Sequence, residues 1–194
     1  MNVKATLIAA AIGTLFSAAA FAQQGTVQRD VNQQNRIEQG LQNGSLTTKE
    51  ASTLEREESR VDKNQARDLR NGNLSATEKA RLQKEQNRVS ADINRKENNA
   101  ATGNPNSASS KRMQADVQRN ANQESRIEQG VKSGSLTNHE AAKLEAGQAR
   151  DDRKEARAGA NGRVTVAEQA RIQRSENHQS KRIFKQKHDA QVRS

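Results

Sequence analysis

The octet NGSLTTKE occupies residues 43–50, and close variants of it return three more times in the chain. They are NGNLSATE at 71–78, SGSLTNHE at 133–140 and NGRVTVAE at 161–168. All four share the pattern Gly-x-(Leu/Val)-(Ser/Thr)-x-x-Glu. This pattern fits the second half of an EF-hand calcium loop, and it also fits the junction at which one helix ends and the next begins. The choice between the two decides whether the octets indicate metal binding.

The order of residues in the octet favours the helix junction. Glycine accepts the left-handed backbone conformation that closes many helices, and a Ser or Thr with a Glu three residues later forms a capping box. The expected N-cap residues are Thr47, Ser75, Thr137 and Thr165. The apolar residues four positions after each Glu, expected to face a partner helix, are Leu54, Leu82, Leu144 and Ile172. We therefore predict that every octet starts a helix.

In an EF-hand, the Glu of the octet would be the bidentate ligand that ends the calcium loop. The four candidate metal ligands are Glu50, Glu78, Glu140 and Glu168. The positions where such a loop opens with Asp hold Gln39, Arg67, Gln129 and Arg157. An Arg repels a cation, and a helix of about 24 residues, roughly 36 Å long, would separate successive octets. These Glu residues are weak metal candidates, and His139, His178 and His188 have no metal-ligand spacing.

The octets belong to a larger repeat. QRDVNQQNRIEQG begins at Gln28 and QRNANQESRIEQG begins at Gln118, 90 positions later (118 − 28). Strong helix formers fill the segments between the octet glycines. The six expected helices cover residues 27–42, 47–70, 75–97, 112–132, 137–158 and 165–189. The sequence predicts an all-α fold of two tandem repeats of three antiparallel helices each, 23–97 and 111–194, joined by a flexible polar linker at 98–110.

The start of the chain has the layout of a secretory signal peptide, assigned to residues 1–22. A positive Lys4 precedes an apolar run from Ala5 to Phe16, and Ala20 to Ala22 form a small-residue cleavage site. We expect cleavage after Ala22 and a protein that is periplasmic or secreted.

Apolar residues are sparse in the rest of the chain, which contains no Cys, Trp or Tyr. We expect a thin core and long, mobile, partly open helical hairpins that strengthen on self-association or partner binding. Charged neighbours on the helix surfaces are expected to add support through i,i+4 pairs. They include Glu55, Glu58 and Arg60, and Asp152, Lys154 and Glu155.

The C-terminal segment 178–194 is strongly basic, and Ile183 and Phe184 lie within it. The candidate residues for binding an anionic surface are Lys181, Arg182, Phe184, Lys185 and Lys187. Docking on an anionic envelope surface or an envelope protein is one interpretation. A solvated basic helix end, favoured by the helix dipole, is the other. Without aromatic stacking residues, no nucleic-acid partner is expected in the cell.

The sequence contains no nucleophile elbow, HExxH motif or phosphate loop. We expect no catalytic residue, no cofactor and no enzymatic activity, and a hydrolase is nearly excluded. The predicted function is a binding or interaction protein of the periplasm, related to envelope stress. The alternative is a degenerate EF-hand-like binder of divalent cations.

The segment RIEQGVKSGSLTNHEAAKLEAGQAR, with ARIQRSENHQSKRIFKQKHDAQ after it, resembles a family of uncharacterised small exported helical-repeat proteins of Gram-negative bacteria. The pattern of that family is RIxQGVKSGxLTxxEAxxLE followed by KHDxQ. The second half of the chain fits it throughout, whereas the first half fits more loosely and lacks the KHD ending. The resemblance implies a helical, exported protein and transfers no site residues.

Overall fold

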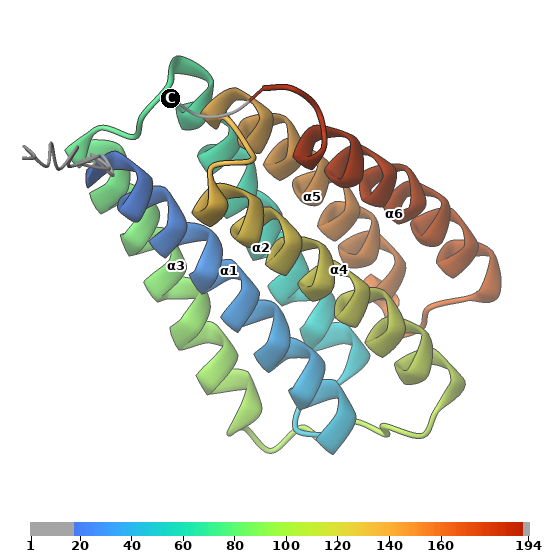
Figure 1. Ribbon diagram of the computed structural model, residues 1–194. Helices are drawn as coiled ribbons and strands as arrows, with labels where there is room; N and C mark the ends of the chain where they lie inside the picture. Colours follow the sequence, from blue (N-terminus) through green and yellow to red (C-terminus); the bar gives the residue numbers. More distant parts are fainter. Residues whose placement is uncertain (1–17, 192–194) are drawn as a thin grey trace, which may run out of the picture.

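The computed structural model describes residues 18–191, which form the six expected helices (Figure 1). They are α1 Ala18–Asn43, α2 Thr48–Asp68, α3 Ala76–Glu97, α4 Ala108–Ser133, α5 Asn138–Ala158 and α6 Val166–Lys187. Two short 3-10 helices, η1 Leu69–Asn71 and η2 Gly159–Asn161, extend α2 and α5. No strand occurs within the described range. The predicted all-α class is confirmed.

The first helix is longer than predicted. α1 begins at Ala18 and continues past the expected cleavage position after Ala22. The remainder of the expected signal peptide, residues 1–17, lies outside the described residues. Among the described helices, none is long and apolar enough to cross a membrane.

The predicted linker is shorter than expected and lies against the helices. α4 begins inside it at Ala108 because Ser107 caps the helix, accepting a hydrogen bond from a first-turn amide. Upstream, the amide of Gly103 donates to the carbonyl of Gly44 at 2.8 Å. A Cβ atom on Gly103 would lie 2.3 Å from the carbonyl oxygen of Leu46. The linker is therefore packed closely on the turn between α1 and α2.

All four octets form the predicted helix junctions. The glycines with positive φ, between 75° and 106°, are Gly44, Gly72, Gly134 and Gly162. At α2, the amide of Thr47 donates to the Glu50 carboxylate at 3.0 Å, and the amide of Glu50 donates to the Thr47 hydroxyl at 3.1 Å. The same reciprocal bonds begin α3, α5 and α6. The capping boxes are confirmed, and the apolar residues that follow each Gly and each Glu are buried.

The innermost contacts of the bundle join the two halves of the chain. α1 packs against α4, and α2 packs against α5 (Figure 1). These pairs are antiparallel, so the end of α5 meets the start of α2, where Gly159 lies against Ser52. α3 and α6 lie on the outside, each against the other helices of its own half. The two halves form one body, which corrects the prediction of partly open hairpins.

Two apolar clusters lie toward opposite ends of the bundle, and each draws on both halves. The first includes Ile37, Leu41, Leu54, Met113, Val117 and Ile172. The second includes Val27, Leu69, Leu82, Ile127, Leu144 and Ile183. The sparse apolar residues of one half are thus buried against those of the other half. This cross-packing supplies the core that each three-helix half lacks alone.

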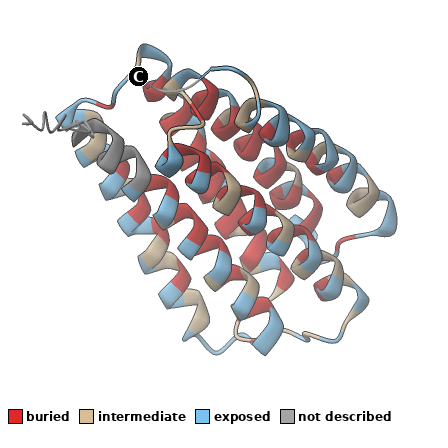
Figure 2. Ribbon diagram, in the orientation of Figure 1, coloured by how far each residue is buried: buried red, intermediate tan, exposed pale blue. Residues whose placement is uncertain are grey.

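Between these clusters the interior is polar. Figure 2 shows buried residues along the facing sides of the inner helices. Fourteen Asp and Glu residues are buried among the described residues, whereas no Lys or Arg is. The acids wrongly predicted to lie on helix surfaces are Glu55, Glu58, Asp152 and Glu155. The spacing of three and four residues that suggested surface pairs also places them on the face that meets the other half.

Candidate cation site in the acidic layer

Eight carboxylates from α1, α2, α4 and α5 form what we call the acidic layer, and none is more than 3% exposed. They are Asp30, Glu55, Glu58, Asp62, Glu124, Glu145, Asp152 and Glu155. On α2 and α5 the acids recur at helical spacing, so each helix presents a row of them on one face. Because α2 and α5 pack directly against each other, the two rows meet in the middle of the bundle.

A first group of carboxylates joins α1 to α2. Asp30, Glu58 and Asp62 each bring one oxygen to within 4.8 Å of the others. Glu58 and Asp62 are four residues apart on α2 and are therefore neighbours on its surface. Asp30 approaches them from α1. The arrangement offers three anionic oxygens to a single point.

A second group shares Asp62 with the first. Asp62, Glu124 of α4 and Glu145 of α5 also lie within 4.8 Å of one another by one oxygen each. Five residues from four helices therefore converge, with Asp62 common to both groups. The site depends on both halves of the chain and could not form in either alone.

The oxygens of these groups have few donors. Glu58 is 1% exposed, and no donor in the described chain reaches either of its oxygens. Asp30 accepts a hydrogen bond from Nε2 of Gln86 at 2.6 Å through one oxygen only. The Gln65 amide lies close enough to Glu145 to lower its pKa, but outside regular hydrogen-bond geometry. Buried carboxylates in this condition require a proton or a cation as partner.

Burial raises the pKa of these acids. The pKa of Asp30 rises to about 7, held down in part by the hydrogen bond from Gln86. Burial likewise raises the pKa of Asp152 to about 7. The pKa values of Glu58 and Asp62 lie well above the ordinary range, first through burial and then through repulsion from neighbouring acids. The layer therefore resists ionisation near neutral pH unless positive charge enters it.

Amide side chains complete the layer. Gln34 donates to Glu55 at 3.1 Å, and Asn120 donates to Asp152. The amide oxygens without a donor among the described residues include those of Gln34, Gln65 and Gln148. Such neutral oxygens are ordinary ligands of calcium.

The available donor atoms are all oxygens. His139, His178 and His188 are exposed, and the chain has no Cys. Carboxylate and amide oxygens suit Mg²⁺, Ca²⁺ and Mn²⁺, whereas Zn²⁺ and Cu⁺ favour nitrogen and sulfur ligands. The chemistry of the layer therefore points to a hard divalent cation.

The metal candidates from the sequence lie elsewhere. Glu50, Glu78, Glu140 and Glu168 are the capping carboxylates of α2, α3, α5 and α6. None of them belongs to either carboxylate group found in the described part of the chain. The convergence of Asp30, Glu58, Asp62, Glu124 and Glu145 was not predicted from the sequence, although a signal existed. In α2, acids occupy helical positions at which a core-facing helix would ordinarily carry apolar residues.

The basic C-terminal candidates lie on α6. Lys181, Arg182, Phe184 and Lys185 are exposed, and Lys187 is half-buried. The Phe184 side chain is 64% exposed and stacks on His188, with ring centroids 4.2 Å apart. Ile183 is buried in the second apolar cluster, so it does not join Phe184 on the surface as expected.

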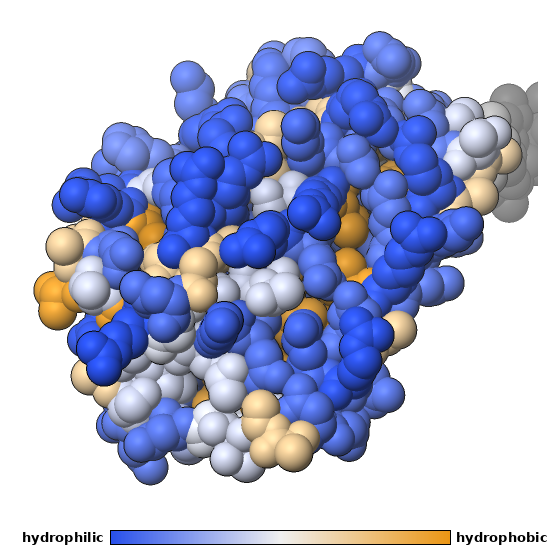
Figure 3. Space-filling view, turned by 180° about the vertical axis from the view of Figure 1, so that it is seen from behind, coloured by the Kyte–Doolittle hydropathy of each residue, from blue (hydrophilic) through white to orange (hydrophobic). Residues whose placement is uncertain are grey.

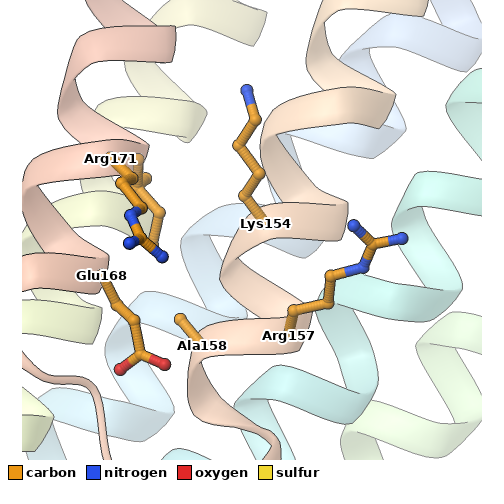
Figure 4. Close-up of a pocket in the computed structure, with 6 residues that line it drawn as sticks. Lys154, Arg157, Ala158, Glu168 and Arg171 are labelled. Carbon is orange, nitrogen blue, oxygen red and sulfur yellow. The ribbon is translucent and has the colours of Figure 1, made fainter.

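A surface pocket of about 290 Å³ lies between α5 and α6 (Figure 4). It is lined by Lys154, Arg157, Ala158, Glu168, Arg171 and Ile172. In the first half, Asp68 stands at the position equivalent to Ala158 and forms an ion pair with Arg81. Arg171, the counterpart of Arg81, lines the pocket beside Ala158. The pocket therefore lies where the second half has Ala158 in place of the carboxylate of the first half.

The outer surface is hydrophilic. On the face seen in Figure 3, hydrophobic residues form only small separate spots. The formal net charge of the chain is +10. Among the described residues, fourteen acids are buried and no Lys or Arg is, so basic groups are in larger excess at the surface than this value indicates. Acidic side chains thus gather in the interior, and basic side chains lie at the surface.

Comparison with protein-family models, curated proteins and solved structures finds no match to this chain.

Proposed function

We propose that this chain is a non-enzymatic binding protein, exported to the periplasm, that holds divalent cations in its acidic layer. The main observation behind this proposal concerns Glu58. It is buried, neither of its oxygens meets a donor in the described chain, and Asp30 and Asp62 lie within 4.8 Å of it. A cation at this point would satisfy all three carboxylates together.

Protons are the competing way to neutralise the layer. A fully protonated layer would require each carboxyl to keep its proton near pH 7, yet the pKa of Asp30 is itself about 7. Ionised carboxylates held this close repel one another strongly in a dry interior. A divalent cation removes two negative charges at once and supplies the attraction that the amides only partly provide.

The test is a thermal melt of the purified chain, followed by circular dichroism in EDTA and then in Ca²⁺, Mn²⁺ or Mg²⁺. A cation present at 100 times its dissociation constant stabilises the folded state by about 2.7 kcal/mol. For a chain of this size, that corresponds to a rise in Tm of roughly 5–10 °C. Identical melting curves with and without all three cations would overturn the proposal.

Glu58→Gln is the informative variant, because its counterpart in the second half is already Gln148. The variant should fold and lose most of the cation-induced rise in Tm. Asp116→Asn is the matched control. Asp116 is an equally buried acid without donors in the described chain, and it lies outside both carboxylate groups. The control should keep the full response.

The basic end of α6 supports a second role, docking on an anionic envelope surface. Phe184 is one of two large hydrophobic residues that are exposed among the described residues, and exposed Lys181 and Lys185 flank it. An exposed aromatic ring among cations suits an anionic lipid interface. Cosedimentation with phosphatidylglycerol vesicles, but not with phosphatidylcholine vesicles, should occur and should weaken in Phe184→Ala. Equal sedimentation with both lipids would exclude this role.

A further inference from the structure

The two carboxylate groups of the acidic layer meet at one residue. We propose that they form a two-ion centre, in which the Asp62 carboxylate bridges two hard divalent cations of about the size of Ca²⁺. This inference rests on the proposed cation-binding function and extends it to a stoichiometry, a geometry and a class of ion.

Each ion would have its own carboxylates. Asp30 and Glu58 serve the first ion from α1 and α2, whereas Glu124 and Glu145 serve the second from α4 and α5. Asp62 belongs to both groups. A carboxylate has two oxygens, and its bridging mode holds two metal ions about 3.5–4 Å apart in other proteins. Because Asp62 is shared, the two ions would lie next to each other rather than at two separate sites.

The unsatisfied oxygens extend over both groups. Both oxygens of Glu58 in the first group lack a donor in the described chain, and so do both oxygens of Glu145 in the second. Glu145 is 0% exposed. One oxygen of Glu124 is also without a donor from the described residues. A single ion at the first group would leave the second group unneutralised.

The charge balance also favours two ions. The five carboxylates carry five negative charges when ionised, and two divalent cations supply four positive charges. One cation alone would leave three buried negative charges, which a low-dielectric interior tolerates poorly. With two cations, one negative charge remains among the five carboxylates, and the amides of Gln65 and Gln148 lie beside Glu145 and Glu124.

The burial of the groups selects the class of ion. Ca²⁺ takes six to eight oxygen ligands in flexible geometry, so carboxylates and amides can replace its water. Mg²⁺ gives up its water reluctantly and demands near-ideal octahedral geometry. The five carboxylates are at most 3% exposed, and this burial favours Ca²⁺, with Mn²⁺ as a suitable spectroscopic substitute.

The internal repeat supplies variants that separate the two ions. Glu124 has Gln34 as its counterpart, and Asp30 has Asn120. Glu124→Gln therefore removes a ligand of the second ion only, in a form that the fold already accepts at the equivalent position. Asp62→Asn removes the proposed bridge. Asp116→Asn again serves as a control for the loss of a buried acid.

The experiment is a titration of the full chain with Mn²⁺, followed by electron paramagnetic resonance, with circular dichroism to confirm that each variant folds. The wild type and Asp116→Asn should bind two Mn²⁺ with a spin-coupled spectrum. Glu124→Gln should bind one Mn²⁺ with an uncoupled spectrum, and Asp62→Asn should bind at most one. Ca²⁺ should displace the bound Mn²⁺ at concentrations at least tenfold below those needed with Mg²⁺.

The outcomes distinguish this inference from the proposed function. One bound Mn²⁺ in both the wild type and Glu124→Gln overturns the two-ion centre and leaves cation binding in place. Two uncoupled ions that persist in Asp62→Asn overturn the bridge. If the folded wild type binds no Mn²⁺, both the inference and the proposed function are wrong.

Discussion

The two halves of the molecule have the same helices but different charges at equivalent interior positions. Where one half carries an acid, the other often carries the amide of the same shape. These pairs are Asp30 and Asn120, Gln34 and Glu124, Glu58 and Gln148, Gln65 and Glu155, and Gln86 and Glu176. Within the acidic layer, acids occupy both members in the pairs Glu55 with Glu145 and Asp62 with Asp152.

Through this alternation the two halves together form groups of carboxylates that neither half has alone. Because each half is buried against the other, both members of every equivalent pair lie in the same interior. Acids at all positions would raise the repulsion in a dry space, whereas amides at all positions would bind no cation strongly. An acid in one half and an amide in the other have nearly the same shape, so the packing of the layer is kept. The carboxylates are then concentrated around Asp62.

The largest effect is expected when the two halves are made alike in charge. The fourfold variant Asp30→Asn, Glu58→Gln, Glu124→Gln and Glu155→Gln gives every altered pair two amides. Replacing a buried ion pair by neutral residues of similar volume stabilises some folds by about 1–4 kcal/mol, and we expect a similar gain for buried acids without a counter-ion. In EDTA at pH 7.5 the Tm should therefore rise by roughly 2–15 °C, and Ca²⁺ should no longer change it.

Differential scanning calorimetry of the wild type and the fourfold variant measures this directly. An equal Tm in EDTA would mean that the acids cost the folded state nothing. A Ca²⁺ response retained by the variant would locate the cations outside the acidic layer.

The pair Gln86 and Glu176 gives the second half a titratable group at a position where the first half has a neutral amide. Burial, with repulsion from Asp116, raises the pKa of Glu176 to about 9, against an ordinary value of 4.5. Between these two pH values, the folded chain keeps a proton that the unfolded chain has released, so stability falls as pH rises. Glu176→Gln should reduce this slope by about 1.4 kcal/mol per pH unit.

Urea unfolding at pH 6, 7 and 8 in EDTA gives the slope. In the first half, Gln86 donates to the carbonyl of Thr26 at 2.9 Å, and a Gln at position 176 can use the equivalent carbonyl of Asp116. Asn177→Ala, an exposed neighbour, should leave the slope unchanged. If Glu176→Gln and the wild type show the same slope, Glu176 is ionised in the folded protein.

Much of the fold could be predicted from local sequence signals. The octets set the helix junctions because a capping box and a glycine with positive φ are decided within a few residues. The cross-packing of α1 on α4 and of α2 on α5 could not be predicted in this way, because it depends on how two equivalent faces meet. For the same reason the sequence alone suggests a surface position for Glu58. Its i,i+4 neighbour Asp62 fits a charged surface and a buried row of ligands equally well.

Gly159 tests the contact between the halves at one end of the bundle. Its counterpart in the first half is the buried Leu69, but a Cβ atom on Gly159 would lie 2.7 Å from Cβ of Ser52 and 3.1 Å from the carbonyl oxygen of Thr48. Gly159→Ala should therefore lower the free energy of unfolding by about 1–2 kcal/mol. Gly25→Ala is the matched control, because its Cβ would meet nothing within 4 Å and helix propensity favours Ala. Urea unfolding of both variants measures the difference in the free energy of unfolding. Equal values would mean that η2 and α2 can move apart at Gly159 without a loss of stability.

The smallest expected effect concerns the pocket between α5 and α6. Asp68 pairs with Arg81, and Ala158 stands at the same position beside Arg171. Asp68→Ala should cost about 1 kcal/mol, and Ala158→Asp should gain at most about 0.5 kcal/mol, because the arginine partners are partly exposed and solvent screens them. Both effects should shrink in 1 M NaCl. Urea unfolding at low and high salt measures them. If Asp68→Ala were neutral at low salt, the pair would contribute no stability, and the absence of a carboxylate at position 158 would cost the second half nothing.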